Sequence, residues 1–159
     1  MRKNKGAITC QYCKSAASKV TGNEIYPHRP DLKCKVFYLC KPCDAYVGCH
    51  PGSSVPLGIL ANAELRQAKR DAHLEFDRLW KEGQITRSKA YIVLARLMLS
   101  NPKNTHIGMM TVEQCKRVIA LCQPLAPLTE KDYCEALEWA KANYPLCKPR
   151  KPKNREKSV

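Results

Sequence analysis

The chain has 159 residues, 44% of them hydrophobic, and its 28 Lys and Arg against 14 Asp and Glu give a formal net charge of +14. A chain of this length and composition can bury a core of its own, which excludes wholesale disorder, and it contains no apolar run of the ~18–20 residues that a membrane helix needs. The basic start, Met1 to Lys5, is not followed by the apolar stretch of a signal peptide, so we expect a cytoplasmic protein.

The first third of the sequence is β-like and rich in cysteine. Its apolar segments are too short for helices and alternate with turn residues, which is typical of small antiparallel sheets. Thr21-Gly22-Asn23 predicts a hairpin turn, and Pro27 and Pro30 predict a loop after it. The expected strands cover residues 18–20, 24–26, 35–39 and 45–47.

From about Leu60 onward the apolar residues recur at spacings of three and four, which predicts helices. Gly83 stands where a C-terminal cap belongs, and Thr111 with Gln114 matches a capping box. The predicted helices cover residues 61–81, 87–99, 111–123 and 129–144.

These patterns predict an α+β protein in three parts. We expect a small zinc-ribbon domain over residues 1–58, packed on a four-helix domain over residues 59–147, with a disordered basic tail over residues 148–159. Lys and Arg exceed Asp and Glu by six, three and five in these parts, so the basic excess is concentrated at the two ends. The loop 50–58, with two prolines and two glycines, is expected to be a tight junction.

Two Cys-x-x-Cys pairs carry the sharpest chemical signal. Cys10 and Cys13 form the first pair, and Cys40 and Cys43 form the second. Each spacing lets one tight turn present two thiolates to the same ion, and four thiolates complete the tetrahedral set that zinc prefers. Because no position is left for water, the sequence predicts one structural zinc ion and no metal catalysis at this site.

The remaining cysteines fit no regular ligand spacing. Cys34, Cys49 and His50 lie close to the second pair, and the sequence leaves open whether one of them replaces a ligand; we expect them to be buried or to line the ribbon. Free cysteine is among the most buried residue types, so the later cysteines are assigned to the core. These are Cys115, Cys122, Cys134 and Cys147.

A second group of chemically capable residues is less specific. His73 and Asp77 are one helical turn apart and share a helix face, and His50 and His106 lie in loops. If they converged they would suit a divalent metal in a phosphodiester-cleaving site. The alternative, which we favour, is a buried hydrogen-bonded network that fixes the helices to the ribbon.

Several segments together are similar to a zinc-finger-containing family of unknown function found in bacteriophages and prophages. The resemblance spans about residues 7–122 and implies a phage origin and a zinc ribbon on the two cysteine pairs, without an established activity. Ile92-Val93 stands where Arg-Trp is expected, and Thr105 stands where a Cys often precedes His-Ile-Gly. The segments that carry the resemblance are residues 10–13, 38–50, 56–58, 61–66, 73, 76–80, 87, 90–91 and 106–109.

The basic excess suggests nucleic acid as a partner. Lysines that neutralise phosphates, beside aromatic rings such as Tyr26 and Tyr38, are what a DNA- or RNA-binding surface uses, and no base-reading helix is evident. We therefore expect a non-catalytic nucleic-acid-binding protein in the host bacterial cytoplasm, with an adaptor that binds a host protein and a metal-dependent nuclease as alternatives. The candidate nucleic-acid contacts are Tyr12, Lys14, Lys19, Lys33, Lys35, Lys41, Lys151 and Lys153.

Overall fold

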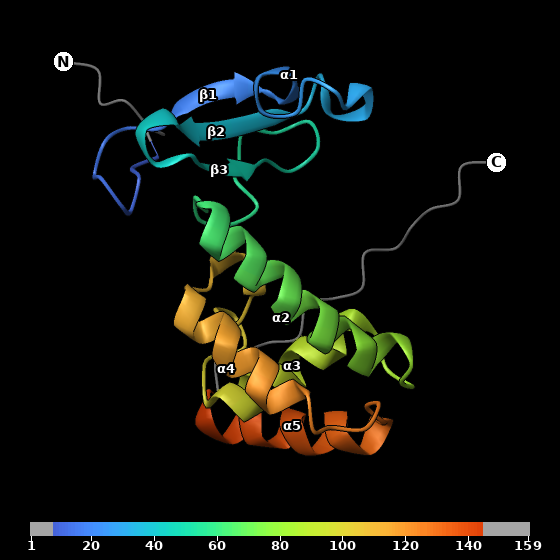
Figure 1. Ribbon diagram of the computed structural model, residues 1–159. Helices are drawn as coiled ribbons and strands as arrows, with labels where there is room; N and C mark the ends of the chain where they lie inside the picture. The colour runs from blue at the N-terminus through green and yellow to red at the C-terminus, as the bar shows by residue number, and fades with distance from the viewer. Residues whose placement is uncertain (1–7, 145–159) are drawn as a thin grey trace. The chain divides into compact units, whose positions relative to one another are not determined.

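The computed structural model describes residues 8–144, which form a mixed α+β fold with a small antiparallel sheet followed by helices (Figure 1). These residues divide into two compact units. The first contains residues 8–77 and 106–124, and the second contains residues 78–105 and 125–144. The predicted basic tail, with Lys151 and Lys153, and Cys147 lie outside the described residues. Within residues 8–144 no helix is long and apolar enough to cross a bilayer.

Three antiparallel strands form the sheet of the first unit. They are β1 (Ser18–Thr21), β2 (Val36–Cys40) and β3 (Ala45–Gly48), in the order β1-β2-β3. Val20 pairs with Phe37, and Phe37 pairs with Gly48. The long loop between β1 and β2 therefore replaces the tight hairpin that the sequence predicted.

The strand predicted at residues 24–26 is wrong. Gly22–Ile25 form the single-turn helix α1, because Thr21 and Glu24 make a capping box that satisfies the N–H groups at its start. Gly22 also has no turn-type positive φ. It is needed for close packing, since a Cβ at this position would lie 1.9 Å from the Leu32 carbonyl oxygen.

The alternation of side chains along the strands gives the sheet two different faces. One face carries Phe37 and Tyr46, whose rings pack edge-on against each other and against Tyr26. The other face contributes Cys40 and Ala45 to a buried cluster with two residues outside the sheet, Cys10 and Leu60. Both faces are thus covered by segments that precede or follow the strands.

Four longer helices follow the sheet. They are α2 (Ala63–Lys81), α3 (Arg87–Met98), α4 (Val112–Cys122) and α5 (Glu130–Asn143), close to the predicted ranges. The capping box of Thr111 and Gln114 is present at the start of α4, and Thr129 caps α5 with Asp132. In the second unit α3 packs against α5, and two ion pairs join them, Lys89 with Glu130 and Arg96 with Glu135.

Gly83 does not cap α2 in the predicted way. Gly52 is the one glycine with a positive φ in the part of the chain that the structure describes, so Gly83 is not left-handed. Its requirement is space, because a Cβ there would lie 2.4 Å from the carbonyl oxygen of Leu79 and 2.5 Å from that of Leu128. The Leu128 N–H donates to Leu79 in the same place, at 2.9 Å.

The loop after β3 contacts a second segment of the first unit, and both belong to the segments that carry the family resemblance. A Cβ on Gly58 would lie 2.0 Å from the carbonyl oxygen of Gly108, so the two backbones touch. The Ile59 N–H and the Lys69 ammonium group both donate to that oxygen, at 3.1 and 2.8 Å. The segments Pro56-Leu57-Gly58 and His106-Ile107-Gly108 are therefore parts of one contact.

Candidate metal centre

Two similar turns place the cysteine pairs. In the first, the Lys14 N–H donates to the Cys10 carbonyl oxygen at 2.9 Å, and Lys14 has a left-handed φ of 63°. The second is the 3₁₀ turn η2 (Lys41–Cys43), which Pro42 favours by fixing φ, and Asp44 after it has a left-handed φ of 44°. Each turn thus ends one residue after its second cysteine, with the backbone bent back so that both thiols face the same side.

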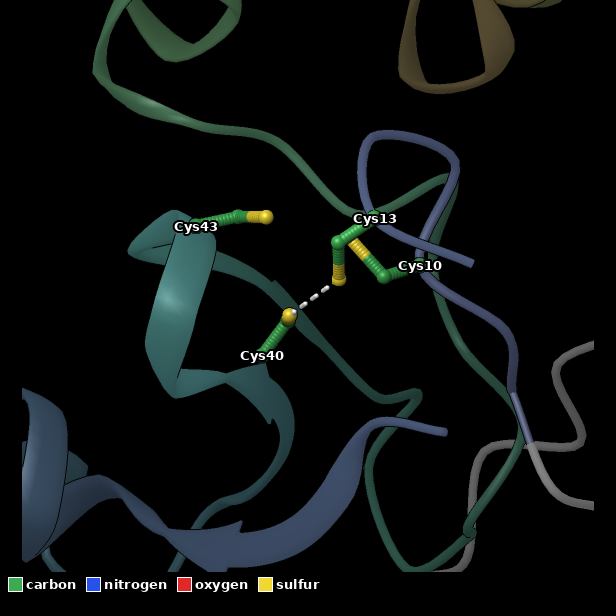
Figure 2. A group of neighbouring side chains, drawn as sticks. All are labelled: Cys10, Cys13, Cys40 and Cys43. Atoms are coloured by element: carbon green, nitrogen blue, oxygen red, sulfur yellow. Dashed lines mark hydrogen bonds between the residues drawn. The ribbon is translucent and has the colours of Figure 1, made fainter. Parts of the chain in front are cut away.

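The four thiols converge on one point. The sulfur atoms of Cys10, Cys13, Cys40 and Cys43 all lie within 4.8 Å of one another, and Figure 2 shows the two turns presenting them face to face. The Cys13 and Cys40 sulfurs are 3.4 Å apart, far beyond the ~2.05 Å of a disulfide bond. Zinc with Zn–S bonds of ~2.3 Å in a tetrahedron requires sulfur separations of about 3.8 Å, so the donor set fits.

Burial and hydrogen bonding divide the thiols into unlike groups. Hydrogen bonds from Ser15, first from its side chain and then from its backbone, lower the pKa of Cys13 to about 6. Burial raises the pKa of Cys40, and the hydrogen bond with Cys13 raises the pKa of Cys43 to about 12. A metal ion must therefore displace protons at neutral pH, and once bound it offsets two of the four thiolate charges.

The neighbouring candidates do not belong to this group. Among residues 8–144 the four thiols are the one group of three or more Cys, His, Asp or Glu side chains placed to hold a metal. Cys49 is half-buried, whereas Cys34 and His50 are exposed, so of the two expected environments, buried or lining the ribbon, burial does not hold for Cys34 or His50. The exposure of Cys34 is consistent with its place outside the sheet, in the loop between η1 (Pro30–Leu32) and β2.

The helical cysteines differ among themselves. Cys115 and Cys122 are fully buried on α4, as predicted. Cys134 is exposed, which corrects its assignment to the core. The buried side of α5 is instead formed by Ala136 and Ala140, two and six residues further along the helix.

The structure brings together only part of the histidine and carboxylate group. His73 Nδ1 and Asp77 Oδ1 are 3.8 Å apart on α2, and both side chains are partly exposed. His50 and His106 are exposed, and neither completes a metal-binding group with that pair in the part of the chain that the structure describes. The arrangement gives no geometric support to a catalytic metal there.

The predicted nucleic-acid contacts lie in different places on the first unit. Lys14 and Lys41 belong to the two cysteine turns, and Tyr12 in the first turn is 41% exposed. Lys33 and Lys35 precede β2, at the opposite end of that strand. The fifth lysine, Lys19 on β1, donates to the Ser54 hydroxyl at 2.7 Å.

Two of the aromatic residues are parts of the fold rather than exposed platforms. Tyr26 is half-buried and its hydroxyl group pairs with that of Tyr46 at 2.9 Å. Tyr38 packs against the buried cluster beside the cysteines, and its hydroxyl group donates to the Ser54 carbonyl oxygen at 3.2 Å. Tyr12 is thus the aromatic side chain of the three that combines exposure with a place in a cysteine turn.

Sequence reasoning missed two residues that contact the cysteine turns. Asn62 and Arg66 lie at the start of α2, and each reaches the residue next to a cysteine, Tyr12 in one case and Asp44 in the other. An Asn directly before a helical pattern is an N-cap signal, so Asn62 was recognisable as a cap. Nothing in the sequence distinguished Arg66 from the other basic residues of α2.

The small antiparallel sheet carries two cysteine turns, and together these turns form a four-sulfur site for one structural zinc ion. This combination defines a zinc-finger protein. The family model of the zinc-finger-containing domain, a domain of unknown function, matches residues 6–124, and the chain belongs to that family. The match contains all four cysteines and ends before α5. Searches of curated proteins and of solved structures found no match.

Proposed function

We propose that the chain binds nucleic acid without catalysing a reaction, using the zinc end of the ribbon as its contact surface. The observation that carries the proposal is the combination of Tyr12, Lys14 and Lys41 on the two cysteine turns, with all three side chains exposed. An exposed ring stacks on an unpaired base, and lysines beside it neutralise phosphates. Because stacking requires an unpaired base, this group of side chains favours single-stranded DNA or RNA over a duplex.

Local charge supports this choice. Of the three acidic residues in residues 8–58, Asp31 pairs with Arg29 and Asp44 pairs with Arg66, both at 2.9 Å. Glu24 is engaged in the cap of α1. The five lysines of this region are therefore opposed mainly by the zinc–thiolate site, whose −2 charge leaves an excess of positive charge for a polyanion.

The proposed origin rests on the motif resemblance, and the proposed host follows from that origin. The segments that are similar to the phage and prophage family support a bacteriophage or prophage protein that acts in the host bacterial cytoplasm.

Fluorescence anisotropy with labelled single-stranded DNA, single-stranded RNA and duplex DNA tests the binding surface. Replacing Lys14 and Lys41 together with Gln should weaken binding and reduce the salt slope by about 0.7–0.9 per lost phosphate contact. Replacing Lys33 and Lys35 with Gln removes the same charge at the far end of β2 and serves as the control. Equal effects of the two double variants, or no binding even at low salt, would contradict the proposal.

Tyr12 allows a separate test of stacking. Tyr12→Leu removes the ring and should cost about 1–3 kcal/mol of binding free energy for a single strand. Tyr12→Phe keeps the ring and should bind as the unchanged chain does. If the two variants bind equally well, the ring takes no part.

A host-protein adaptor is a second candidate, favoured by exposed apolar side chains in the first unit. Val55, Leu57 and Met109 are 58%, 51% and 54% exposed. Leu57 and Met109 adjoin the contact between Gly58 and Gly108. The test is a pull-down from host lysate with and without nuclease treatment. The adaptor is supported if one protein stays bound after nuclease treatment and Leu57→Glu abolishes its binding. Loss of all bound protein after nuclease treatment contradicts it.

A further inference from the structure

The first turn of α2 contacts both cysteine turns at once. Asn62 directly precedes α2 as its N-cap and Arg66 is the fourth residue of the helix, so both side chains project from the N-terminal end of α2. Asn62 accepts a hydrogen bond from the Tyr12 hydroxyl group at 3.2 Å, and Arg66 binds Asp44. All of these residues belong to the first unit.

Arg66 makes the stronger of the two contacts. One guanidinium nitrogen donates to the Asp44 and Ala61 carbonyl oxygens at 2.7 and 2.9 Å, and another donates to the Asp44 carboxylate at 2.9 Å. The guanidinium carbon lies 4.1 Å from the centre of the Tyr46 ring. The Arg66 side chain is only 19% exposed, whereas the Asp44 side chain is 73% exposed, so the guanidinium group is the shielded partner of this ion pair.

Asn62 anchors the other turn. Its side-chain oxygen also accepts from the Leu65 N–H at 2.9 Å, which satisfies one of the free donors at the start of α2. Its own N–H donates to the Tyr12 hydroxyl oxygen at 3.4 Å. The Tyr12 hydroxyl group is therefore held by the helix cap itself.

Each contact ends next to a zinc ligand in the sequence. Tyr12 directly precedes Cys13, and Asp44 directly follows Cys43. A shift of either turn relative to α2 would therefore move a sulfur atom. Because the helix turn that carries Asn62 and Arg66 joins both, it holds the two turns at a fixed separation.

We infer that Arg66 and Asn62 are positioning residues of the zinc site, and that the first turn of α2 keeps the four thiols assembled so that zinc is released slowly. Groups that orient metal ligands from outside the coordination shell commonly change metal affinity by about 10- to 100-fold when they are removed, and with an unchanged association rate zinc release becomes faster by the same factor. This inference rests on the zinc site and is independent of nucleic-acid binding.

The test is the rate of zinc transfer from the zinc-loaded full chain to a chromogenic chelator in excess. Arg66→Met, which keeps the length of the side chain, should release zinc about 10- to 100-fold faster, and Arg66→Lys should be intermediate because it keeps the charge but loses the paired donors. Arg70→Met is the matched control, since Arg70 lies one turn further along α2 and donates to Gln67 of the same helix.

Two further variants separate positioning from general loss of stability. Val118→Ala opens a cavity at a fully buried position of α4 in the same unit and should leave the release rate within about twofold of the unchanged chain. Tyr12→Phe removes one hydroxyl group, keeps the fold and should also speed release. The inference is overturned if Tyr12→Phe and Arg66→Met release zinc at the rate of Arg70→Met, or if Val118→Ala speeds release as much as Arg66→Met.

Discussion

The guanidinium group of Arg66 stacks on the ring of Tyr46 while it donates to both the carbonyl oxygen and the carboxylate of Asp44. A planar guanidinium group can do both at once, whereas the ammonium group of a lysine cannot. The Tyr46 hydroxyl group in turn pairs with Tyr26, and burial followed by this hydrogen bond raises the pKa of Tyr46 to about 12. One side chain of α2 therefore joins β3 to a cysteine turn, and Tyr46 extends this connection to Tyr26 after α1.

Loss of the zinc ligands is expected to unfold the ribbon. Cys10→Ser together with Cys40→Ser removes one thiolate from each turn, and a structural zinc site contributes on the order of 10–16 kcal/mol in isolated fingers. Atomic emission should find about one zinc per unchanged chain and almost none in the double variant. Cys34→Ser, at an exposed cysteine outside the site, should retain the metal. Retention of zinc by the double variant would show that the ligands are elsewhere.

Zinc affinity is expected to rise with pH. In the metal-free site the raised pKa values of Cys40 and Cys43 keep these thiols protonated at neutral pH, so zinc binding expels protons. Below the pKa of Cys13, about 6, one more proton must be displaced, and the slope of log affinity against pH should steepen by about one.

Chelator competition over a range of pH measures this slope. Ser15→Ala should move the change of slope to higher pH, because the Ser15 side chain is the largest cause of the lowered pKa of Cys13. A slope that stays constant through pH 6 in the unchanged chain would count against this account.

The left-handed backbone at Lys14 predicts an unusual response to substitution. Lys14→Val should lower the free energy of unfolding by about 1–2 kcal/mol, because a β-branched residue is disfavoured at positive φ. Lys14→Gly should be neutral or slightly stabilising, since relief of the strain offsets the greater freedom of glycine in the unfolded chain. Urea unfolding at fixed free zinc compares the two, and equal stabilities would argue against strain at this turn.

The contact between Gly58 and Gly108 should tolerate no side chain. A Cβ at Gly58 would overlap the Gly108 carbonyl oxygen at 2.0 Å, so Gly58→Ala should destabilise the first unit by about 3 kcal/mol or more. Gly52→Ala tests the opposite case, because nothing lies within 4 Å of its Cβ and its φ is +68°; the expected cost is about 1 kcal/mol. Thermal unfolding followed by circular dichroism distinguishes them, and equal losses would refute the steric account.

The sequence correctly predicted those turns, caps and helices whose formation depends on residues close together in the chain. The two Cys-x-x-Cys turns, the capping box at Thr111 and the four long helices depend on neighbouring residues, and all are present. The strand predicted over residues 24–26 depends on Gly22 acting as a hairpin glycine, whereas Gly22 is required for space beside Leu32. Distant pairings such as Arg66 with Asp44 leave no periodic trace, so the support of the metal site could not be predicted.

The first unit is discontinuous in sequence, since the chain leaves it after Asp77 and returns at His106. During synthesis the residues that bind zinc are complete once Cys43 has left the ribosome, and the brace from Arg66 follows soon after. Lys69, however, must wait for the carbonyl oxygen of Gly108, and the buried positions of α4 come later still. We therefore expect a nascent chain to be able to bind zinc before the core of the first unit is complete, because the last residues of that unit follow Cys43 by some 80 positions and synthesis adds ~5–20 residues per second.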